Sequence, residues 1–411
     1  MDFSFSEEQI AFRETARQFS EKALAPFAAE WDANSLCPKD AIREAGALGF
    51  CSLYCDEEHG GMGLSRLDAA LIFEQLSQGC TSTTAFITIH NMATWMLTRF
   101  GSDAIRARWA ADLMSGEKLA SYCLTEPGAG SDAASLSTTA KKDGDDYVLN
   151  GAKAFISGAG DTDVLVLMAR TGGPGAGGIS CFAVPADTPG ISYGRNEAKM
   201  GWKSQPTRAV ILEDARISAD CLIGEEGQGF RIAMAGLDGG RINIASCSLG
   251  AAQAALRQAQ QYVQERKQFG QAIGDFQTVQ FTLADMATEL VAAQQMVRLA
   301  AWKLDQNHSD KSMLCAMAKR LATDLCFNVC NQALQLHGGY GYISEYPLER
   351  YVRDTRVHQI LEGTNEIMRV IIARKCAERF IVSVKGRTSE VRPVSKRTKI
   401  SARESGRERQ P

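Results

Sequence analysis

The sequence predicts a mainly helical α+β protein of several domains: a helical N-terminal domain, a β-rich middle domain and a second helical domain. In the first part of the chain apolar residues recur at helical spacing, as at Ile10, Ala16 and Phe19. In the middle, short β-rich runs are separated by Gly, Pro and Asp, and after Gly224 long helical patterns return. We expect the domains to span residues 1–118, 119–223 and 224–383, followed by a tail at 384–411.

Composition supports an ordinary folded protein. At 411 residues the chain is long enough for roughly two or three domains, and 45% of its residues are hydrophobic and 23% charged. It has no apolar run of about 20 residues and no signal-peptide pattern at its start. We therefore expect a soluble protein without a membrane span, either cytoplasmic in a bacterium or in the mitochondrial matrix after processing.

Twelve cysteines are scattered singly through apolar segments, which is typical of reduced, buried thiols. The two close pairs, Cys51 with Cys55 and Cys326 with Cys330, have no histidine nearby at metal-ligand spacing. We expect neither disulfides nor a metal site.

Five short runs predict the strands of the middle domain. No helical pattern separates them, so a doubly wound parallel sheet is excluded and an antiparallel β-barrel is expected. The runs are 147–149, 154–156, 164–167, 181–184 and 209–212.

Long helices dominate the C-terminal domain. The segment 278–304 contains no Gly or Pro, and its apolar residues step by three, four or seven, a seam suited to a helix bundle or a subunit interface. A second helix, with Leu314 and Leu325, ends at Gly338-Gly339. The tail 384–411 is basic and nearly free of apolar residues, which predicts disorder. The net charge of -3 argues against a nucleic-acid-binding body.

Two glycine-rich segments imitate a dinucleotide-binding motif. Residues 173–178 match G-x-G-x-x-G but lead into another strand, so no helix N-terminus receives a pyrophosphate. We expect a hairpin loop there. Residues 128–133 also open no convincing helix, although their glycines permit close backbone approach to a ligand.

Three blocks carry the chemistry: residues 122–132 (YCLTEPGAGSD), 336–341 (LHGGYG) and 360–367 (ILEGTNEI). Glu362 lies beside Gly363, where the backbone can approach a ligand closely, and burial there would raise its pKa toward the working pH. Alone, such a glutamate is more often a solvated surface carboxylate. The ordered set of blocks resembles the acyl-CoA dehydrogenase family over residues 1 to about 380. That resemblance implies a helical N-terminal domain, a middle β-barrel and a C-terminal four-helix bundle, with Glu362 as the catalytic base.

By the same resemblance the cofactor is FAD. Tyr122 to Thr125 and Phe155 to Ser157 would line the flavin ring, with Phe155 standing where the family often has Trp. Arg266 would face the pyrophosphate of a neighbouring subunit's FAD, and Glu366 would act only through its backbone. The implied cofactor-binding residues are Tyr122, Cys123, Leu124, Thr125, Gly130, Ser131, Phe155, Ile156, Ser157, Arg266, Phe269, Phe276, Gln277, Gln335, Leu336, His337, Gly338, Gly339, Thr364, Asn365 and Glu366.

The implied reaction is α,β-dehydrogenation of an acyl-CoA, with Glu362 removing the α-proton and flavin N5 taking the β-hydride. Some relatives place the base near Arg241, but Gly240 stands there, so no rival carboxylate exists. Segments 81–92 and 201–210 resemble the branched short-chain members, and we expect Gly239-Gly240 to leave room for an α-methyl branch; Trp202 and His90 could equally be core residues. The implied substrate-binding residues are Ser131, Leu237, Asp238, Gly239, Gly240, Arg241 and Arg374.

The expected substrate is isobutyryl-CoA, converted to methacrylyl-CoA in valine catabolism, and the alternative is straight-chain butyryl-CoA. One methyl group is worth only ~1–3 kcal/mol in a hydrophobic pocket, so cross-activity is expected. An oxidase of the same fold and a nucleic-acid-associated flavoprotein are further alternatives. The resemblance also implies a homotetramer, a dimer of dimers, with an electron-transferring flavoprotein as acceptor and no nucleic-acid partner.

Overall fold

The computed structural model describes residues 4–389, with side chains up to residue 378. The chain forms two compact units, Met1–Ile372 and Ala373–Pro411, and each is described by itself. Residues 390–411, most of the expected disordered tail, lie outside the described range. The last helix, α12 (Asn365–Ser389), continues past the expected boundary at residue 383.

Helices form the N-terminal part, as predicted. Ser6 caps the first of them, because its hydroxyl accepts a hydrogen bond from the Gln9 amide at 3.1 Å, and Ser65 and Asp68 cap the fourth in the same way. The helices are α1 (Glu7–Phe19), α2 (Ala28–Asn34), α3 (Lys39–Ala47), α4 (Arg66–Gly79), α5 (Thr81–Phe100) and α6 (Asp103–Met114).

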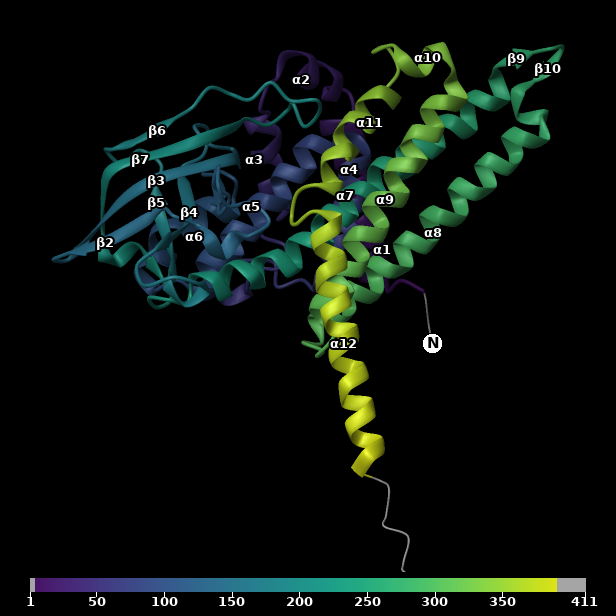
Figure 1. The fold of residues 1–411 in the computed structure, drawn as a ribbon. Helices are drawn as coiled ribbons and strands as arrows, with labels where there is room; N and C mark the ends of the chain where they lie inside the picture. The colour runs from purple at the N-terminus through teal and green to yellow at the C-terminus, as the bar shows by residue number, and fades with distance from the viewer. Residues whose placement is uncertain (1–3, 390–411) are drawn as a thin grey trace, which may run out of the picture. The chain divides into compact units, whose positions relative to one another are not determined.

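The middle part is one eight-stranded sheet (Figure 1). Seven strands follow the order β6-β7-β3-β2-β4-β5-β8, and β1 pairs in parallel with β4. The runs 147–149 and 154–156 belong to one long strand, β3, bulged near Gly151 and again between Lys153 and Ile156. The strands are β1 (Ala120–Cys123), β2 (Thr139–Asp143), β3 (Asp146–Ser157), β4 (Val164–Arg170), β5 (Ile179–Pro185), β6 (Ile191–Tyr193), β7 (Thr207–Ser218) and β8 (Leu222–Ile223).

The predicted closed barrel is wrong. The sheet ends at β6, which pairs only with β7, and at β8, which pairs only with β5. Both end strands are too short to close the sheet, and α7 packs against β4 and β5. The loop 173–178 does join β4 to antiparallel β5, as expected for a hairpin.

Three long helices, α7, α8 and α9, pack against one another in the C-terminal part (Figure 1). Small side chains such as Ala255, Ala318 and Ala322 allow the close approach, and the predicted helices at 278–304 and 314–337 correspond to α8 and α9. The expected four-helix bundle is seen only as these three helices, because most of α12 falls in the second unit. The elements are α7 (Gly229–Glu265), β9 (Lys267–Gln268), β10 (Gln271–Ala272), α8 (Gln277–Asp305), α9 (Lys311–His337), α10 (Gly339–Tyr342) and α11 (Leu348–Arg356).

Short turns complete the chain. They are the π-helical η1 (Ser20–Leu24) and the 3-10 segments η2 (Glu57–His59), η3 (Ala133–Ser135), η4 (Ala176–Gly178), η5 (Ala219–Cys221), η6 (Ile273–Asp275) and η7 (Val357–Gln359). All twelve cysteines are free thiols; ten are buried as predicted, whereas Cys37 is partly buried and Cys376 is exposed. Over the described range, none of the helices combines the length and the apolar character that crossing a membrane requires.

Candidate active site

Glu362 lies in the turn between η7 and α12, in a strained conformation. Its φ is +56°, in the left-handed region that L-residues other than Asn and Asp seldom adopt, and Gly363 follows with φ +87°. Its Oε2 is buried and finds no hydrogen-bond donor among the described residues. Burial raises the pKa of Glu362 from 4.5 to about 7, although the charges of Arg241 and Lys319 pull it down. Such a carboxylate is suited to take up a proton near neutral pH.

Gly240 on α7 faces this carboxylate. A Cβ at Gly240 would lie 2.5 Å from Glu362 Oε2 and 2.9 Å from its Cδ, so any side chain there would displace the base. At Gly239 a Cβ would collide with the guanidinium of Arg66. The base and Arg66 thus lie directly against Gly239 and Gly240, and room there for the α-methyl branch of a substrate stays a prediction.

Tyr122 and Arg241 complete the polar surroundings of Glu362. The Tyr122 hydroxyl and Arg241 Nε are buried without hydrogen-bond partners in the described part of the chain. Burial and the Glu362 charge raise the pKa of Tyr122 well above its usual value. Arg241 pairs with Asp238 at 2.6 Å, and Ser312 donates to the same carboxylate. Together with Glu362 Oε2, these unpaired atoms fit a polar ligand that supplies the missing partners.

The two segments predicted to line the flavin ring, 122–125 and 155–157, lie next to each other in the structure. The Ala154 amide donates to the Thr125 carbonyl at 2.9 Å, which joins the end of β1 to β3. Phe155 sits on the second bulge of β3 with φ +56°, and its side chain is 71% exposed. An exposed aromatic ring held at a strained backbone position can cover a flat ligand. Gly130 and Ser131 are exposed nearby in sequence, with open space around Gly130.

A buried ion pair beneath these segments is a feature that the sequence analysis missed. Lys153 and Glu126 are 2.8 Å apart, with side chains 0% and 3% exposed. Lys153 also donates to the Leu124 carbonyl, and Glu126 accepts from the amides of Ser137 and Thr138. The available signal was the placement of two charged residues directly beside the Thr125 and Phe155 segments.

A second group of predicted cofactor residues lies at the C-terminal end of α9. Arg266 and residues 335–339 line an open cavity of about 440 Å³. His337 stacks on Tyr262 at 4.2 Å, and burial lowers its pKa. Phe269, 95% exposed with φ +52°, contacts Phe276, which precedes Gln277 at the start of α8. His337 is 18 residues beyond Lys319 on α9, which corresponds to roughly 27 Å along the helix.

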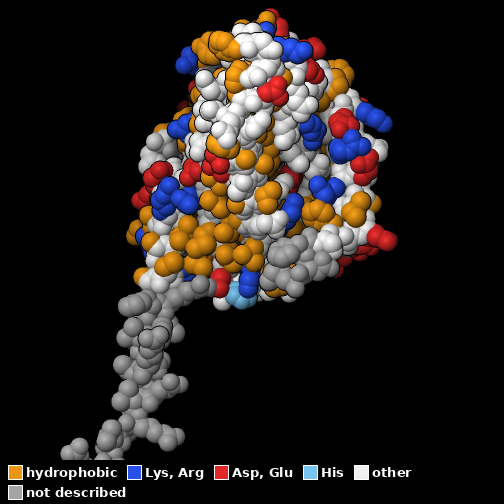
Figure 2. Space-filling model, turned by 90° about the vertical axis from the view of Figure 1, so that its right-hand side faces the viewer, with side chains coloured by type: hydrophobic (Ala, Val, Ile, Leu, Met, Phe, Trp, Pro, Cys, Tyr) orange, Lys and Arg blue, Asp and Glu red, His pale blue; other side chains and the backbone are white. Residues whose placement is uncertain are grey.

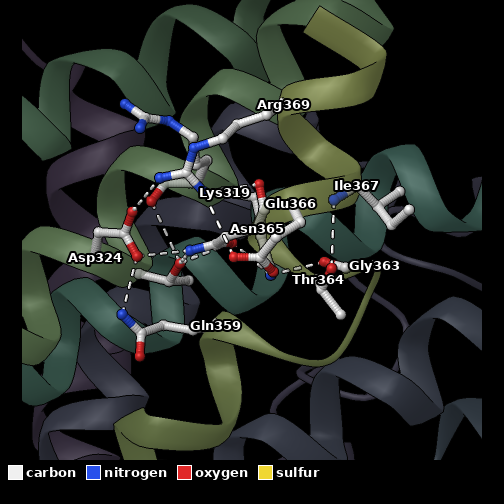
Figure 3. A network of polar contacts seen from close by, with 11 residues as sticks. Lys319, Asp324, Gln359, Gly363, Thr364, Asn365, Glu366, Ile367 and Arg369 are labelled. Carbon is white, nitrogen blue, oxygen red and sulfur yellow. Dashed lines mark hydrogen bonds and ion pairs between the residues drawn. The ribbon is translucent and has the colours of Figure 1, made fainter. Parts of the chain in front are cut away.

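The turn after Glu362 is tied to α9 by polar contacts (Figure 3). The Asn365 side-chain amide donates to Thr323 and Asp324 and accepts from Lys319, so its side chain is fully engaged. Glu366 is exposed near Arg369, and the Thr364 hydroxyl accepts from the Ile367 amide. Asn365 therefore keeps mainly its backbone groups for a ligand, and a role for Thr364 and Glu366 toward a cofactor stays a prediction.

Four positions singled out in the sequence lie elsewhere. Leu237 packs into the core under the sheet, and Arg374 belongs to the unit that begins at Ala373 and is placed only within it. His90 is a core residue, since Nε2 lies 2.7 Å from the Leu113 carbonyl and Nδ1 accepts from the Ala120 amide. Trp202 is also buried, with Nε1 donating to His358 Nε2 at 3.0 Å.

The helical, β-sheet and helical parts, together with a carboxylate suited to act as a base, are consistent with a flavin-dependent acyl-thioester dehydrogenase, the class to which the family comparison assigns the chain. Residues 6–117, 121–215 and 227–377 match the N-terminal, middle and C-terminal domains of acyl-CoA dehydrogenase. The chain belongs to the acyl-CoA dehydrogenase family, whose members are FAD-dependent oxidoreductases.

Individual members of the family are similar to this chain over most of its length. The chain is 56% identical over 369 residues to the mitochondrial isobutyryl-CoA dehydrogenase of Bos taurus, covering 90% of this chain and 89% of the relative. It is 42% identical over 365 residues to the mitochondrial short-chain specific acyl-CoA dehydrogenase of Homo sapiens, covering 88% of each. The butyryl-CoA dehydrogenase structure from Megasphaera elsdenii superimposes with a TM-score of 0.89 at 37% identity, covering 92% of this chain and all of the other.

Proposed function

We propose that this protein oxidises a short branched-chain acyl-CoA, isobutyryl-CoA to methacrylyl-CoA, in valine catabolism, with Glu362 as the base. The observation that carries the reaction is the Glu362 carboxylate, whose Oε2 is buried without a hydrogen-bond partner among the described residues and whose pKa is raised to about 7. The greater identity to the isobutyryl-CoA dehydrogenase than to the short-chain enzyme, 56% against 42%, supports the branched substrate. Butyryl-CoA is the alternative.

In the proposed reaction Glu362 Oε2 accepts the proton from Cα of the thioester. FAD, which Phe155, Thr125 and Ser157 would hold, would supply the acceptor for the Cβ hydride, so that loss of the proton and the hydride leaves a Cα–Cβ double bond. The Glu362 backbone N–H polarises the thioester carbonyl as negative charge develops on it. After the transfer Glu362 is neutral, and a neutral carboxyl group is better tolerated than a charge in a buried site.

The described residues fit FAD. Phe155 offers a ring face, Thr125 and Ser157 offer hydrogen bonds, and Arg266 offers a guanidinium suited to phosphate. Arg266 lies at the C-terminal end of α9, whereas the Glu362 turn contacts α9 at residues 319–324. We therefore propose that each subunit contributes its Arg266 to a neighbour's FAD. Tyr122 and Arg241 would meet polar atoms of the cofactor or the thioester.

We further propose a dimer-of-dimers homotetramer that passes electrons to an electron-transferring flavoprotein. The face in Figure 2 displays hydrophobic side chains in clusters. On α8 four large apolar side chains are exposed and would be covered by another subunit. They are Phe281, Val291, Leu299 and Trp302.

We also propose domain boundaries at 118/119, 223/224 and 383/384. For the location of the protein we propose either the bacterial cytoplasm or the mitochondrial matrix. The mitochondrial relatives support the latter. No described contact assigns a role to the tail.

The test is anaerobic bleaching of the bound flavin by isobutyryl-CoA, butyryl-CoA and 2-methylbutyryl-CoA, with Glu362→Gln as control. We expect isobutyryl-CoA to bleach the flavin fastest and the control to lose the reaction. Faster bleaching by butyryl-CoA would replace the branched substrate by the alternative, and bleaching by none would refute the proposed enzyme. Rapid reoxidation of the reduced flavin in air would indicate an oxidase.

A further inference from the structure

Lys319 on α9 is a fully buried basic residue that touches the turn of Glu362. Its side chain is 0% exposed, and Nζ donates to the Gly363 carbonyl at 2.9 Å and to Asn365 Oδ1 at 2.8 Å (Figure 3). Gly363 directly follows the base. The ammonium is therefore attached to the backbone that sets the direction of the Glu362 side chain.

Helix α9 is hydrogen-bonded to the chain both before and after Glu362. Thr323 and Asp324, about one turn beyond Lys319, accept from the Asn365 amide at 2.9 and 2.8 Å. Asp324 also accepts from Gln359 Nε2 at 2.9 Å, ahead of the base in sequence. Glu362 thus lies between two segments that are both fastened to α9.

The charge of Lys319 is not explained by these hydrogen bonds. Both of its contacts are neutral oxygens, and within the described residues it has no carboxylate at ion-pair distance. Burying an ammonium is costly unless other charges compensate it, and a neutral donor would serve the two acceptors at lower cost. The group that a positive charge on Lys319 would stabilise most directly is the Glu362 carboxylate in the adjacent turn.

We propose that Lys319 is a positioning residue for the base: it fixes the Glu362–Gly363 turn through the Gly363 carbonyl, and its charge favours the ionised Glu362 carboxylate. This inference rests on the proposed role of Glu362. Lys319 acts through Glu362 and the turn rather than on the substrate.

The charged surroundings define the expected pH effect. Glu362 is faced by Tyr122 from β1, Arg241 from α7 and Lys319 from α9, and the two cations oppose the effect of burial on its pKa. Burial lowers the pKa of Lys319 to about 7, while Glu362, Asp324 and Glu366 raise it and Arg241 lowers it. Loss of Lys319 leaves Arg241 as the opposing cation, so the pKa of Glu362 should rise.

The test measures flavin reduction by isobutyryl-CoA in the FAD-loaded enzyme from pH 6 to 9.5. For Lys319→Met, we expect the apparent pKa of reduction to rise by about one unit or more, since a nearby opposite charge shifts a carboxyl pKa by about 1–3. For a rise of one unit the rate at pH 7 should fall about fivefold, and it should recover at high pH. Binding of the thioester should change little.

Lys199→Met is the matched control. Lys199 is half-buried and donates to the Gln205 carbonyl and the Thr207 hydroxyl at 2.7 Å, with no contact to the Glu362 turn. We expect it to lower the melting temperature without moving the pH profile. If Lys319→Met behaves like this control, Lys319 has a structural role only and the inference is overturned.

Two further variants separate the possible failures. If Lys319→Met yields no folded flavoprotein, Lys319→Gln keeps a donor without the charge: a shifted profile supports the inference, and an unshifted one overturns it. If Glu362→Gln reduces the flavin at the wild-type rate, the proposed base itself is wrong. If Glu362→Gln is inactive while neither Lys319 variant shifts the profile, only the role of Lys319 fails.

Discussion

Removing Glu126 from its buried pair with Lys153 should destabilise the protein severely. In Glu126→Leu the Lys153 ammonium, with no exposed surface, keeps only the Leu124 carbonyl, and the amides of Ser137 and Thr138 lose their acceptor. Breaking one partner of a buried pair costs about 3–5 kcal/mol because the other charge remains uncompensated. We expect a loss of that size in the free energy of unfolding.

The pKa shifts support this magnitude. Burial alone would raise the pKa of Glu126, but the Lys153 charge and hydrogen bonds lower it from 4.5 to about 2. This shift corresponds to about 3 kcal/mol, since one pKa unit is about 1.4 kcal/mol. Burial lowers the pKa of Lys153, so part of that gain is offset. Because the Glu126 pKa is depressed, its contribution is full above pH 4.5 and is lost as the pH falls through about 2.

The assay is urea unfolding of the wild type, Glu126→Leu, Lys153→Met and the double variant, followed by circular dichroism at pH 7 and pH 3. The double variant carries no unpaired buried charge, so it should be more stable than either single variant. Its stability should also respond less to acid than that of the wild type. A double variant as unstable as the sum of the two single variants would show that the pair is not an energetic unit, and the reasoning would be refuted.

Two other predictions concern the base. Gly240→Ala should slow flavin reduction at least about 100-fold, because its Cβ would stand 2.5 Å from Glu362 Oε2 and misplacement of a catalytic group by about 1 Å costs that much; stopped-flow reduction measures this, and a wild-type rate would contradict the observed packing. Burial raises the pKa of Glu362 to about 7, so the folded chain binds more protons than the unfolded chain between pH 4.5 and 7, and its stability should fall as the pH rises through that window. Glu362→Gln, which is never charged, should then be up to about 3 kcal/mol more stable than the wild type at pH 8 and equal to it below pH 4.5, as measured by urea unfolding of the flavin-free chain. Equal stability at pH 8 would show that the carboxylate is not desolvated.

The sequence predicted elements with strong local signals. The uninterrupted apolar seam at 278–304 marked α8 nearly to the residue, and the strand composition placed β3, β4, β5 and β7. The sequence could not show that the sheet stays open. A closed barrel would require pairing between the end strands β6 and β8, and these strands are too short to leave a recognisable sequence pattern. The bulges that join two predicted runs into β3 have no local signature either.

The site was predicted unevenly for a similar reason. Blocks of adjacent residues, such as those around Glu362 and His337, can be recognised in the sequence alone. Lys319 and Lys153 are single charges within apolar segments, and their partners, Gly363 and Glu126, lie 44 and 27 residues away in the chain. Only the folded structure shows that these lysines are buried and which groups they hold.

Three of the seven non-glycine residues with positive φ in the described range are predicted site residues: Phe155, Phe269 and Glu362. Each such conformation costs on the order of 1–3 kcal/mol, and glycine would relieve the strain. Selection of laboratory variants for heat resistance alone would therefore favour glycine at these positions. The same changes would remove two aromatic rings and the base, so a screen for thermostable variants must score turnover alongside melting temperature.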